Sequence, residues 1–300
     1  MQAIQRALFA GLLALCASAL TARPACAQVD LSGTYSQTAA ADNTTDPFIG
    51  DYTGLPINDA ERLRADSWTA EKWDQEQHEC DPHPADYAPR APGGIRIWPE
   101  LDPLTYAVRA WHIEVYTNGT ARTIYMDDGH PQPSPYAPLT WNGFSIGKWD
   151  GDKLEVVTTH LKEGWIRRNG LMRSSKATLI EYFIRHGDFL TIVSIVKDPV
   201  YLTEPLVRTE HWYLNPGYTL SPYTCTPRDV VDQPASWVPH HLPGTNEFLK
   251  EFPSNFGIPV EATRGGAETM YPEYIQKLAT LPPPPPPAPS AKATPDAAKP

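Results

Sequence analysis

The chain has 300 residues, of which 41% are hydrophobic, 25 are Lys or Arg and 35 are Asp or Glu, so its formal charge is −10. About 250 residues remain when the two ends of biased composition are set aside, which is enough for one large domain with a substantial core. The excess of acidic side chains argues against a nucleic acid partner and against anionic lipid surfaces, since both attract basic proteins.

The first 27 residues have the pattern of an export signal. Arg6 precedes an apolar run from Ala7 to Leu20, and Ala25-Cys26-Ala27 is the small-x-small pattern that signal peptidases cut. The apolar run has about 14 residues, short of the roughly 20 that a membrane-spanning helix needs, so we expect no stable membrane anchor. The pattern predicts a periplasmic or secreted protein. Its mature form would carry 23 basic and 35 acidic side chains, a charge of −12.

Residues 28–94 form the predicted N-terminal segment, and one stretch of it is helical in type. Asn58 is a good capping residue, and the stretch that it opens, from Asn58 to Gln77, has few β-branched positions. We therefore predict one helix over 58–77.

From Ile95 onward the sequence alternates between apolar and polar residues, and turn signals such as T-N-G-T, W-D-G-D and R-H-G-D separate several of the segments. Short turns imply antiparallel neighbours, and so many consecutive strands usually close into a barrel or form a sandwich. We predict a mainly β core over 95–225, an antiparallel meander closing into a lipocalin-like barrel, with a sandwich as the alternative. The strand-like segments are 105–117, 121–126, 144–149, 153–161, 177–185, 189–197 and 205–214.

Two further segments follow the predicted core. Residues 226–280 are rich in Pro and aromatic residues and contain a predicted short helix near 272–278, which suggests a wrapping arm that covers an open end or face of the β-structure. Residues 281–300 include six consecutive prolines followed by Ala, Ser and Lys, a composition that predicts an extended, disordered tail.

Two cysteines remain outside the signal segment, Cys80 and Cys225. An even pair in an oxidising compartment favours a disulfide, and a Cys nucleophile is the alternative. The bridge would join the segment that leads into the β-rich region to the segment that leaves it.

A candidate catalytic group lies in the bend between two predicted strands. Tyr125 and Asp127 are two residues apart and would share one face of a strand, with His130 just beyond. Asp127 could orient His130 as a general base, and the Tyr125 hydroxyl could donate to a developing oxyanion. The group suits cofactor-free chemistry of the lyase, isomerase or hydrolase type. Alternatively, Asp127-Asp128-Gly129 simply makes the turn.

Aromatic and polar residues elsewhere in the predicted strands would form a small-molecule pocket if they face the barrel interior. Alternation places His112 and Glu114 on one face of their strand and Trp111 on the other. Such a pocket favours a small apolar or aromatic molecule, whereas the alternative for each residue is ordinary exposure to water. The predicted ligand-binding residues are Trp111, His112, Glu114, Trp141, Ser145, Trp149 and His211.

The sequence predicts neither a metal site nor a cofactor. His78, Cys80, Asp81 and His83 are close in sequence, but no H-x-H, H-E-x-x-H or paired C-x-x-C spacing accompanies them. The G-x-S-x-G match around Ser145 lies between two predicted strands, whereas the serine-hydrolase motif joins a strand to a helix.

The bend and the strand that follows it carry a recognisable order of residues, Y-x-D, H-P and then G-x-S-x-G-x-W-x-G-D. This order resembles a large family of secreted bacterial β-rich proteins of unassigned function, over roughly residues 31–225. The resemblance implies an architecture without a reaction. Relatives usually have Asp-Gly-Arg before the His-Pro step, and this Arg is missing here. If it binds an anionic ligand group in relatives, its absence implies a different ligand or another way of holding it. The matching residues are Tyr125, Asp127, His130, Pro131, Trp141, Gly143, Ser145, Gly147, Trp149, Gly151 and Asp152.

The sequence thus favours an exported barrel that binds a small apolar or aromatic molecule in its cavity, and leaves open whether the molecule is transformed. The alternatives are a non-catalytic periplasmic carrier and an envelope scaffold that works through its proline-rich tail. The oligomeric state is left open.

Overall fold

The computed structural model describes residues 29–38, 47–90, 92–116, 121–127, 132–222, 224–228 and 237–284. The predicted export signal, His130 and most of the proline-rich tail lie outside these ranges.

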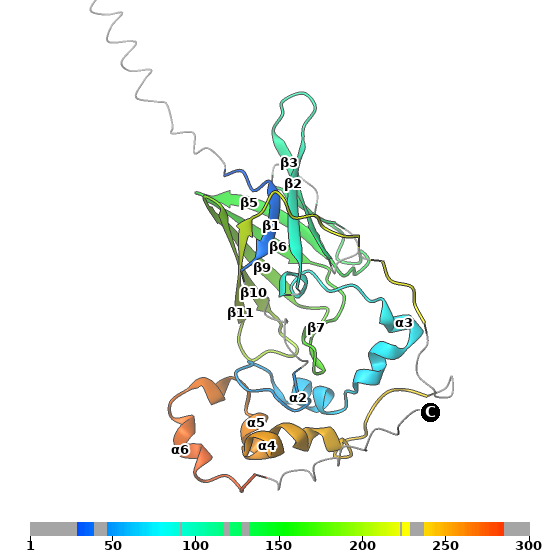
Figure 1. The fold of residues 1–300 in the computed structure, drawn as a ribbon, viewed down its shortest axis with the longest axis vertical. Coiled ribbons are helices and arrows are strands. Elements are labelled where there is room, and N and C mark those ends of the chain that lie inside the picture. The colour runs from blue at the N-terminus through cyan, green and yellow to red at the C-terminus, as the bar shows by residue number, and fades with distance from the viewer. Residues whose placement is uncertain are drawn as a thin grey trace, which may run out of the picture.

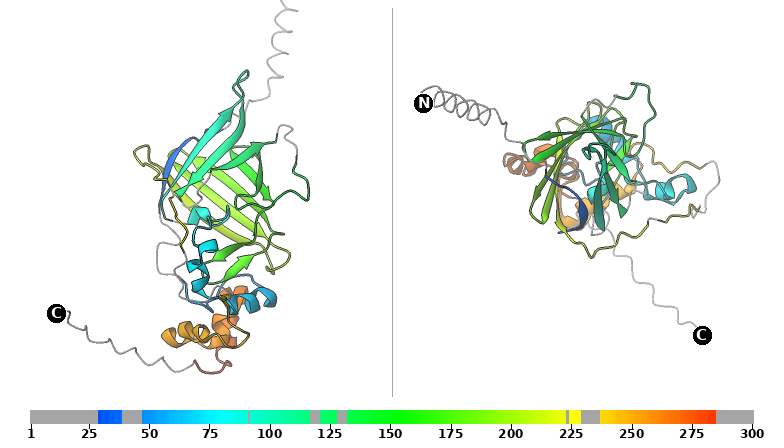
Figure 2. Two further views of the ribbon diagram at one scale, coloured as in Figure 1. Left: turned by 90° about the vertical axis from the view of Figure 1, so that its right-hand side faces the viewer. Right: turned by 90° about the horizontal axis from the view of Figure 1, so that it is seen from above.

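A closed barrel forms the body of the molecule (Figures 1 and 2). Its strand order is β1-β11-β10-β9-β6-β5-β4-β3-β2, and β1 closes the ring by pairing with both β11 and β2. The prediction of a mainly β barrel is therefore confirmed. The strands are β1 (Gly33–Gln37), β2 (Gly94–Leu101), β3 (Val108–Val115), β4 (Arg122–Met126), β5 (Phe144–Asp150), β6 (Lys153–Thr159), β9 (Thr178–His186), β10 (Phe189–Lys197) and β11 (Leu206–Leu214).

The barrel departs from a purely antiparallel meander at one pair of strands. β4 and β5 run parallel, with Tyr125 opposite Ile146, whereas the other barrel pairs are antiparallel. The chain between Met126 and Phe144 is longer than a hairpin turn. It can therefore run back to the end of the barrel at which β4 begins, so that β5 starts in the same direction.

Apolar side chains fill the barrel, because alternate residues of each strand point inward. Trp212 and Tyr35 are 0% exposed and Phe183 is 1% exposed. A hollow in this interior, bounded by Arg122, Glu181 and Phe183 among others, measures about 10 Å³, roughly the space of one water molecule. The buried cluster comprises Leu31, Tyr35, Ala88, Ile95, Ile97, Trp111, Ile113, Val115, Ile124, Met126, Leu154, Val156, Phe183, Leu190, Ile192 and Trp212.

A second core closes one end of the barrel. The hairpin of β7 (Gly164–Arg167) and β8 (Leu171–Arg173) leaves the barrel between β6 and β9 and packs with the N-terminal segment. The buried side chains of this second core come from the N-terminal segment, the hairpin and the adjoining parts of the barrel strands: Tyr52, Ile57, Ala65, Ala85, Leu161, Ile166, Leu171, Ala177, Leu179, Val196, Leu202 and Leu206.

The predicted helix over 58–77 is not continuous. The chain forms α2 (Asp59–Asp66), the 3-10 turn η1 (Ala70–Asp74) and α3 (Glu76–Glu79). Its start is as predicted, because the Asn58 side chain accepts a hydrogen bond from Glu61 N at 3.0 Å. It breaks where Thr69 takes an extended backbone (φ −136°, ψ 143°) and Trp68 packs on the β7–β8 turn.

The C-terminal arm covers the closed end through the N-terminal segment (Figure 2). Tyr52 N donates to Thr263 O at 2.8 Å, and Gly54 N donates to Gly266 O at 2.9 Å. The predicted short helix is present as α6. The remaining short elements are η2 (Ala88–Arg90), η4 (Glu247–Lys250), α4 (Glu251–Phe256), α5 (Val260–Thr263), η5 (Gly266–Met270) and α6 (Tyr274–Leu278).

The predicted Cys80–Cys225 disulfide is present, with the two Cα atoms 5.7 Å apart. It fastens the end of α3 to the chain that follows β11, and Arg228 N donates to the Glu79 carboxylate beside it. Such a bridge is compatible with an oxidising, exported location. Among the described residues, no helix is both long and apolar enough to cross a membrane.

Candidate functional site

The residues of the predicted catalytic bend lie on the outer face of the barrel. Ile124 and Met126 point inward, so Tyr125 points outward, where it stacks on Phe144 with ring centroids 5.5 Å apart. Asp127 is exposed and borders an outer hollow of about 250 Å³. Because His130 lies outside the described residues, its catalytic pairing with Asp127 stays a prediction.

The predicted ligand-binding residues do not share one cavity. Trp111, Ser145 and Trp149 face the packed interior. Those on the outer face are His112, Glu114 and His211. The His112 ring stacks on Trp98 and contacts Glu100 at 3.1 Å, and the His211 ring contacts the Thr191 hydroxyl at 3.2 Å. Trp141 packs against Trp165 of β7, outside the barrel, and Lys162 lies over the Trp141 ring.

Ser145 belongs to a buried polar network that sequence reasoning missed. Arg122 Nε donates to Ser145 Oγ at 3.0 Å, and its Nη2 donates to Thr158 Oγ1 at 2.6 Å and to the Glu181 carboxylate. These four residues are at most 4% exposed. They join β4, β5, β6 and β9, which makes their primary role structural.

A cleft of about 490 Å³ lies outside the barrel, below β7 and β8. Its walls are the end of α2, the η1 and α3 turns, the β7–β8 turn and the start of the C-terminal arm. The lining residues are Arg64, Ser67, Trp68, Lys72, Gln75, His78, Gly170, Met172, Trp237, Val238, Pro239 and His240.

The cleft is basic, although the chain as a whole is acidic. Four of its lining residues have basic side chains, and none of the described lining residues is acidic. Arg64 pairs with Glu163 and His78 with Asp81, whereas Lys72 and His240 form no ion pair with any residue that the structure describes. Among the described lining residues, Lys72 therefore carries a positive charge that no described acidic side chain offsets.

Two tryptophans add aromatic surface to the cleft, one from the N-terminal segment and one from the C-terminal arm. Trp68 follows α2, and Trp237 lies in the C-terminal arm. Trp68 lies against Gly170, which has φ +95°, and a Cβ at that position would come within 2.5 Å of Trp68 Cβ. Glycine is therefore required there both for the backbone conformation and for space.

The arm that supplies Trp237 and His240 is fastened to the end of α2. His241 N donates to Ser67 O at 2.9 Å, and the Asn246 side chain donates to Asp66 O at 2.7 Å. Before the arm, Cys225 is bonded to Cys80 at the end of α3. The disulfide therefore fixes the α3 wall of the cleft in addition to stabilising the fold.

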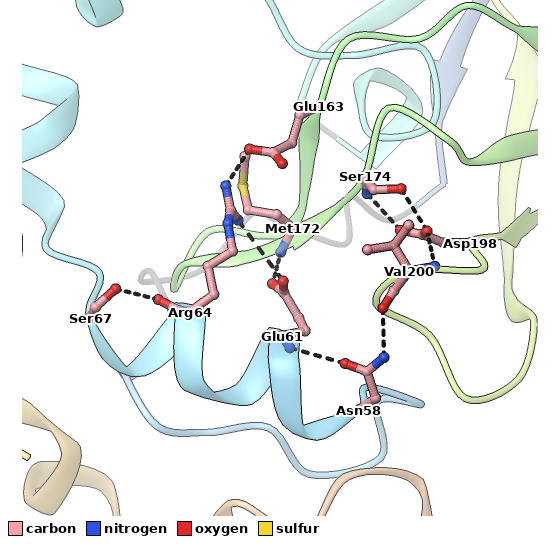
Figure 3. Close-up of polar contacts among 9 residues, drawn as sticks. All are labelled: Asn58, Glu61, Arg64, Ser67, Glu163, Met172, Ser174, Asp198 and Val200. Atoms are coloured by element: carbon pink, nitrogen blue, oxygen red, sulfur yellow. Dashed lines mark hydrogen bonds and ion pairs between the residues drawn. The ribbon is translucent and has the colours of Figure 1, made fainter. Parts of the chain in front are cut away.

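A buried carboxyl group lies behind the α2 wall of the cleft (Figure 3). Glu61 is 0% exposed and accepts a hydrogen bond from Met172 N. Its Oε2 atom forms no hydrogen bond and lies 4.0 Å from Arg64 Nη1. Burial raises the pKa of Glu61 to about 8, more than the Met172 amide and Arg64 lower it. Below that pH the group is neutral.

Within the described part of the chain, no three His, Cys, Asp or Glu side chains are grouped so that they could hold a metal ion. Comparisons with family models, curated proteins and solved structures give no match for this chain. The resemblance in the bend therefore stays a prediction. Sequence reasoning missed the cleft because its described residues come from three separate stretches of the chain that share no motif. Among them only His78 drew attention, as a metal candidate.

Proposed function

We propose that this is an exported protein that binds a small aromatic anion in the cleft between α2, the β7–β8 turn and the C-terminal arm. The observation that carries the proposal is the lining: four basic side chains and two tryptophans, with no acidic residue among its described members. Basic groups in a concave, partly dry site attract an anion, and the indoles offer flat faces for a ring.

Binding without turnover suits this site best. The Ser67 hydroxyl donates to Arg64 O at 2.7 Å rather than to a histidine, so the described lining residues include no hydroxyl activated as a nucleophile. A periplasmic carrier or binding protein is accordingly the function that we propose. The export signal pattern and the disulfide support the location.

The test uses 2-naphthalenesulfonate, an aromatic anion, and 2-naphthalenemethanol, a neutral molecule of similar shape. Wild type should bind the sulfonate more tightly than the alcohol, measured by calorimetry and by quenching of tryptophan fluorescence. Lys72→Ala should weaken sulfonate binding by roughly five- to tenfold and leave alcohol binding unchanged, since one unit charge is removed.

Lys197→Ala is the matched control, because Lys197 is exposed on β10 and does not line the cleft. An equal loss of sulfonate affinity in both variants, or no preference for the anion in wild type, would exclude the cleft as an anion site.

Acid-base chemistry at the outer hollow is a second proposal. It is supported by the position of Asp127 at the rim of that hollow, with Phe144, the stacking partner of Tyr125, in its lining. Here His130→Ala should abolish turnover of a ligand that co-purifies with the protein and is identified by native mass spectrometry, while its binding persists. Full turnover in the variant would rule out this role.

A further inference from the structure

We propose that an anion binds in the cleft together with a proton, which is held on Glu61, so that ionisation of Glu61 weakens the binding. This inference rests on the proposed function of the cleft and adds the way in which its affinity is regulated.

Glu61 and the cleft share two residues. Arg64 lines the cleft and also lies 4.0 Å from Glu61 Oε2 through its Nη1 atom. Met172 lines the cleft and donates its backbone N–H to the Glu61 carboxyl group. Figure 3 shows Glu61 and Arg64 rising from α2 toward Met172 and Glu163. A charge on Glu61 is therefore separated from a cleft ligand by a single side chain.

The groups around Glu61 leave it short of positive charge. Arg64 faces it from α2, and the carboxylates of Glu163, before β7, and Asp198, after β10, raise its pKa. Tyr52 and Tyr201 also face it, and the pKa values of both phenols are raised by burial, so they stay neutral. Ionised Glu61 would therefore meet two carboxylates and one guanidinium group.

The positive charge of Arg64 therefore stabilises both an anion in the cleft and an ionised Glu61, and these two negative charges repel each other. Two unit charges about 10 Å apart, at an effective dielectric constant of about 20, change each other's binding constant roughly tenfold. Because coupling is reciprocal, the anion must also raise the pKa of Glu61, and binding must take up protons near pH 8. Free imidazole groups and lysine side chains have ordinary pKa values of about 6.5 and 10.4, outside the interval from about pH 7.5 to 9.5.

The experiment is calorimetric titration of wild type and Glu61→Gln with 2-naphthalenesulfonate, whose charge is constant from pH 7 to 9.5. Each pH is measured in two buffers of different ionisation enthalpy, which gives the number of protons taken up. Glutamine keeps an oxygen that can accept from Met172 N and cannot ionise. Wild type should lose roughly tenfold in affinity across this interval and take up protons around pH 8.5, whereas Glu61→Gln should show neither effect.

An equal decline in Glu61→Gln, or binding by wild type without proton uptake, would overturn the coupling but not the anion site. Failure of wild type to bind the sulfonate at pH 7 would overturn both. The proton count on wild type decides the matter even if the variant does not fold. Glu163→Gln is the matched control: it removes the exposed partner of Arg64, and should raise affinity at every pH while the decline persists.

Discussion

An arginine lies beside a buried glutamate both in the barrel interior and at the wall of the cleft, and the two pairs differ in how closely the side chains meet and in how far the arginine is exposed. Arg122 contacts the carboxylate of Glu181 directly and also bonds Ser145 and Thr158, inside a packed core. Arg64 lies 4.0 Å from Glu61 and pairs instead with Glu163, and its side chain is 29% exposed at the wall of an open cleft. A close, fully buried pair holds strands together, whereas Arg64, which is farther from its buried glutamate and partly exposed at the cleft, can also face a ligand.

The largest effect is expected from loss of the disulfide. This change should affect the cleft more than the barrel. Cys80→Ser with Cys225→Ser opens a loop of 145 residues, for which the chain-entropy model gives about 4 to 5 kcal/mol of unfolding free energy. Because the bridge fastens the cleft wall, sulfonate affinity should fall even at denaturant concentrations where circular dichroism shows an intact barrel. Unchanged affinity in the folded variant would show that the wall holds without the bridge.

Breaking the barrel pair should cost about 3 to 5 kcal/mol. Glu181→Ala leaves the Arg122 charge buried without its carboxylate, the case in which removal of one partner is most costly. Chemical denaturation measures the loss. Replacing both residues, Arg122→Met with Glu181→Leu, should recover much of it. If the single variant loses less than about 1 kcal/mol, the pair does not stabilise the barrel.

The contribution of Glu61 to the free energy of unfolding should fall as the pH rises, whereas that of a carboxyl group with a lowered pKa would increase. The pKa of Glu61 rises from 4.5 to about 8 on folding, so between those values the folded protein holds a proton that the unfolded chain lacks. Its contribution to stability is present below pH 4.5 and is lost, by about 1.4 kcal/mol per unit, as the pH rises to 8.

Glu61→Gln lacks this loss. Its unfolding free energy relative to wild type should therefore increase steadily from pH 4.5 to 8, to about 3 kcal/mol at pH 7. Urea denaturation at a series of pH values gives the difference, and a constant difference would contradict the raised pKa.

The smallest effect concerns the floor of the cleft. Gly170→Ala places a methyl group against Trp68 at a backbone angle of +95°, and should cost about 1 to 3 kcal/mol and weaken sulfonate binding. Gly187→Ala is the control, because Gly187 has φ +59° and no atom within 4 Å of the added methyl group. It should cost about 1 kcal/mol and leave binding intact. Equal binding losses in both variants would show that the Trp68 contact is not what matters.

Local patterns in the sequence predicted the structural features that depend on residues close together in the chain. Alternation marked the strands, Asn58 marked the start of α2, and the count of cysteines gave the Cys80–Cys225 pair. The same kind of pattern extended the helix through Thr69, where packing of Trp68 on the β7–β8 turn overrides helix propensity. It also left open on which face of the barrel each polar residue would act.

The sequence by itself determined a mainly β barrel with one disulfide, because a period of two and an even pair of cysteines need no distant contacts to be recognised. Only the tertiary structure decided that the barrel is filled and that a basic cleft forms beside it. Arg64, Lys72, Gly170 and Trp237 come together there across 173 positions of chain, from Arg64 to Trp237. The physical reason is that packing of the arm and hairpin on α2 sets these contacts, and no local pattern records which segments will meet.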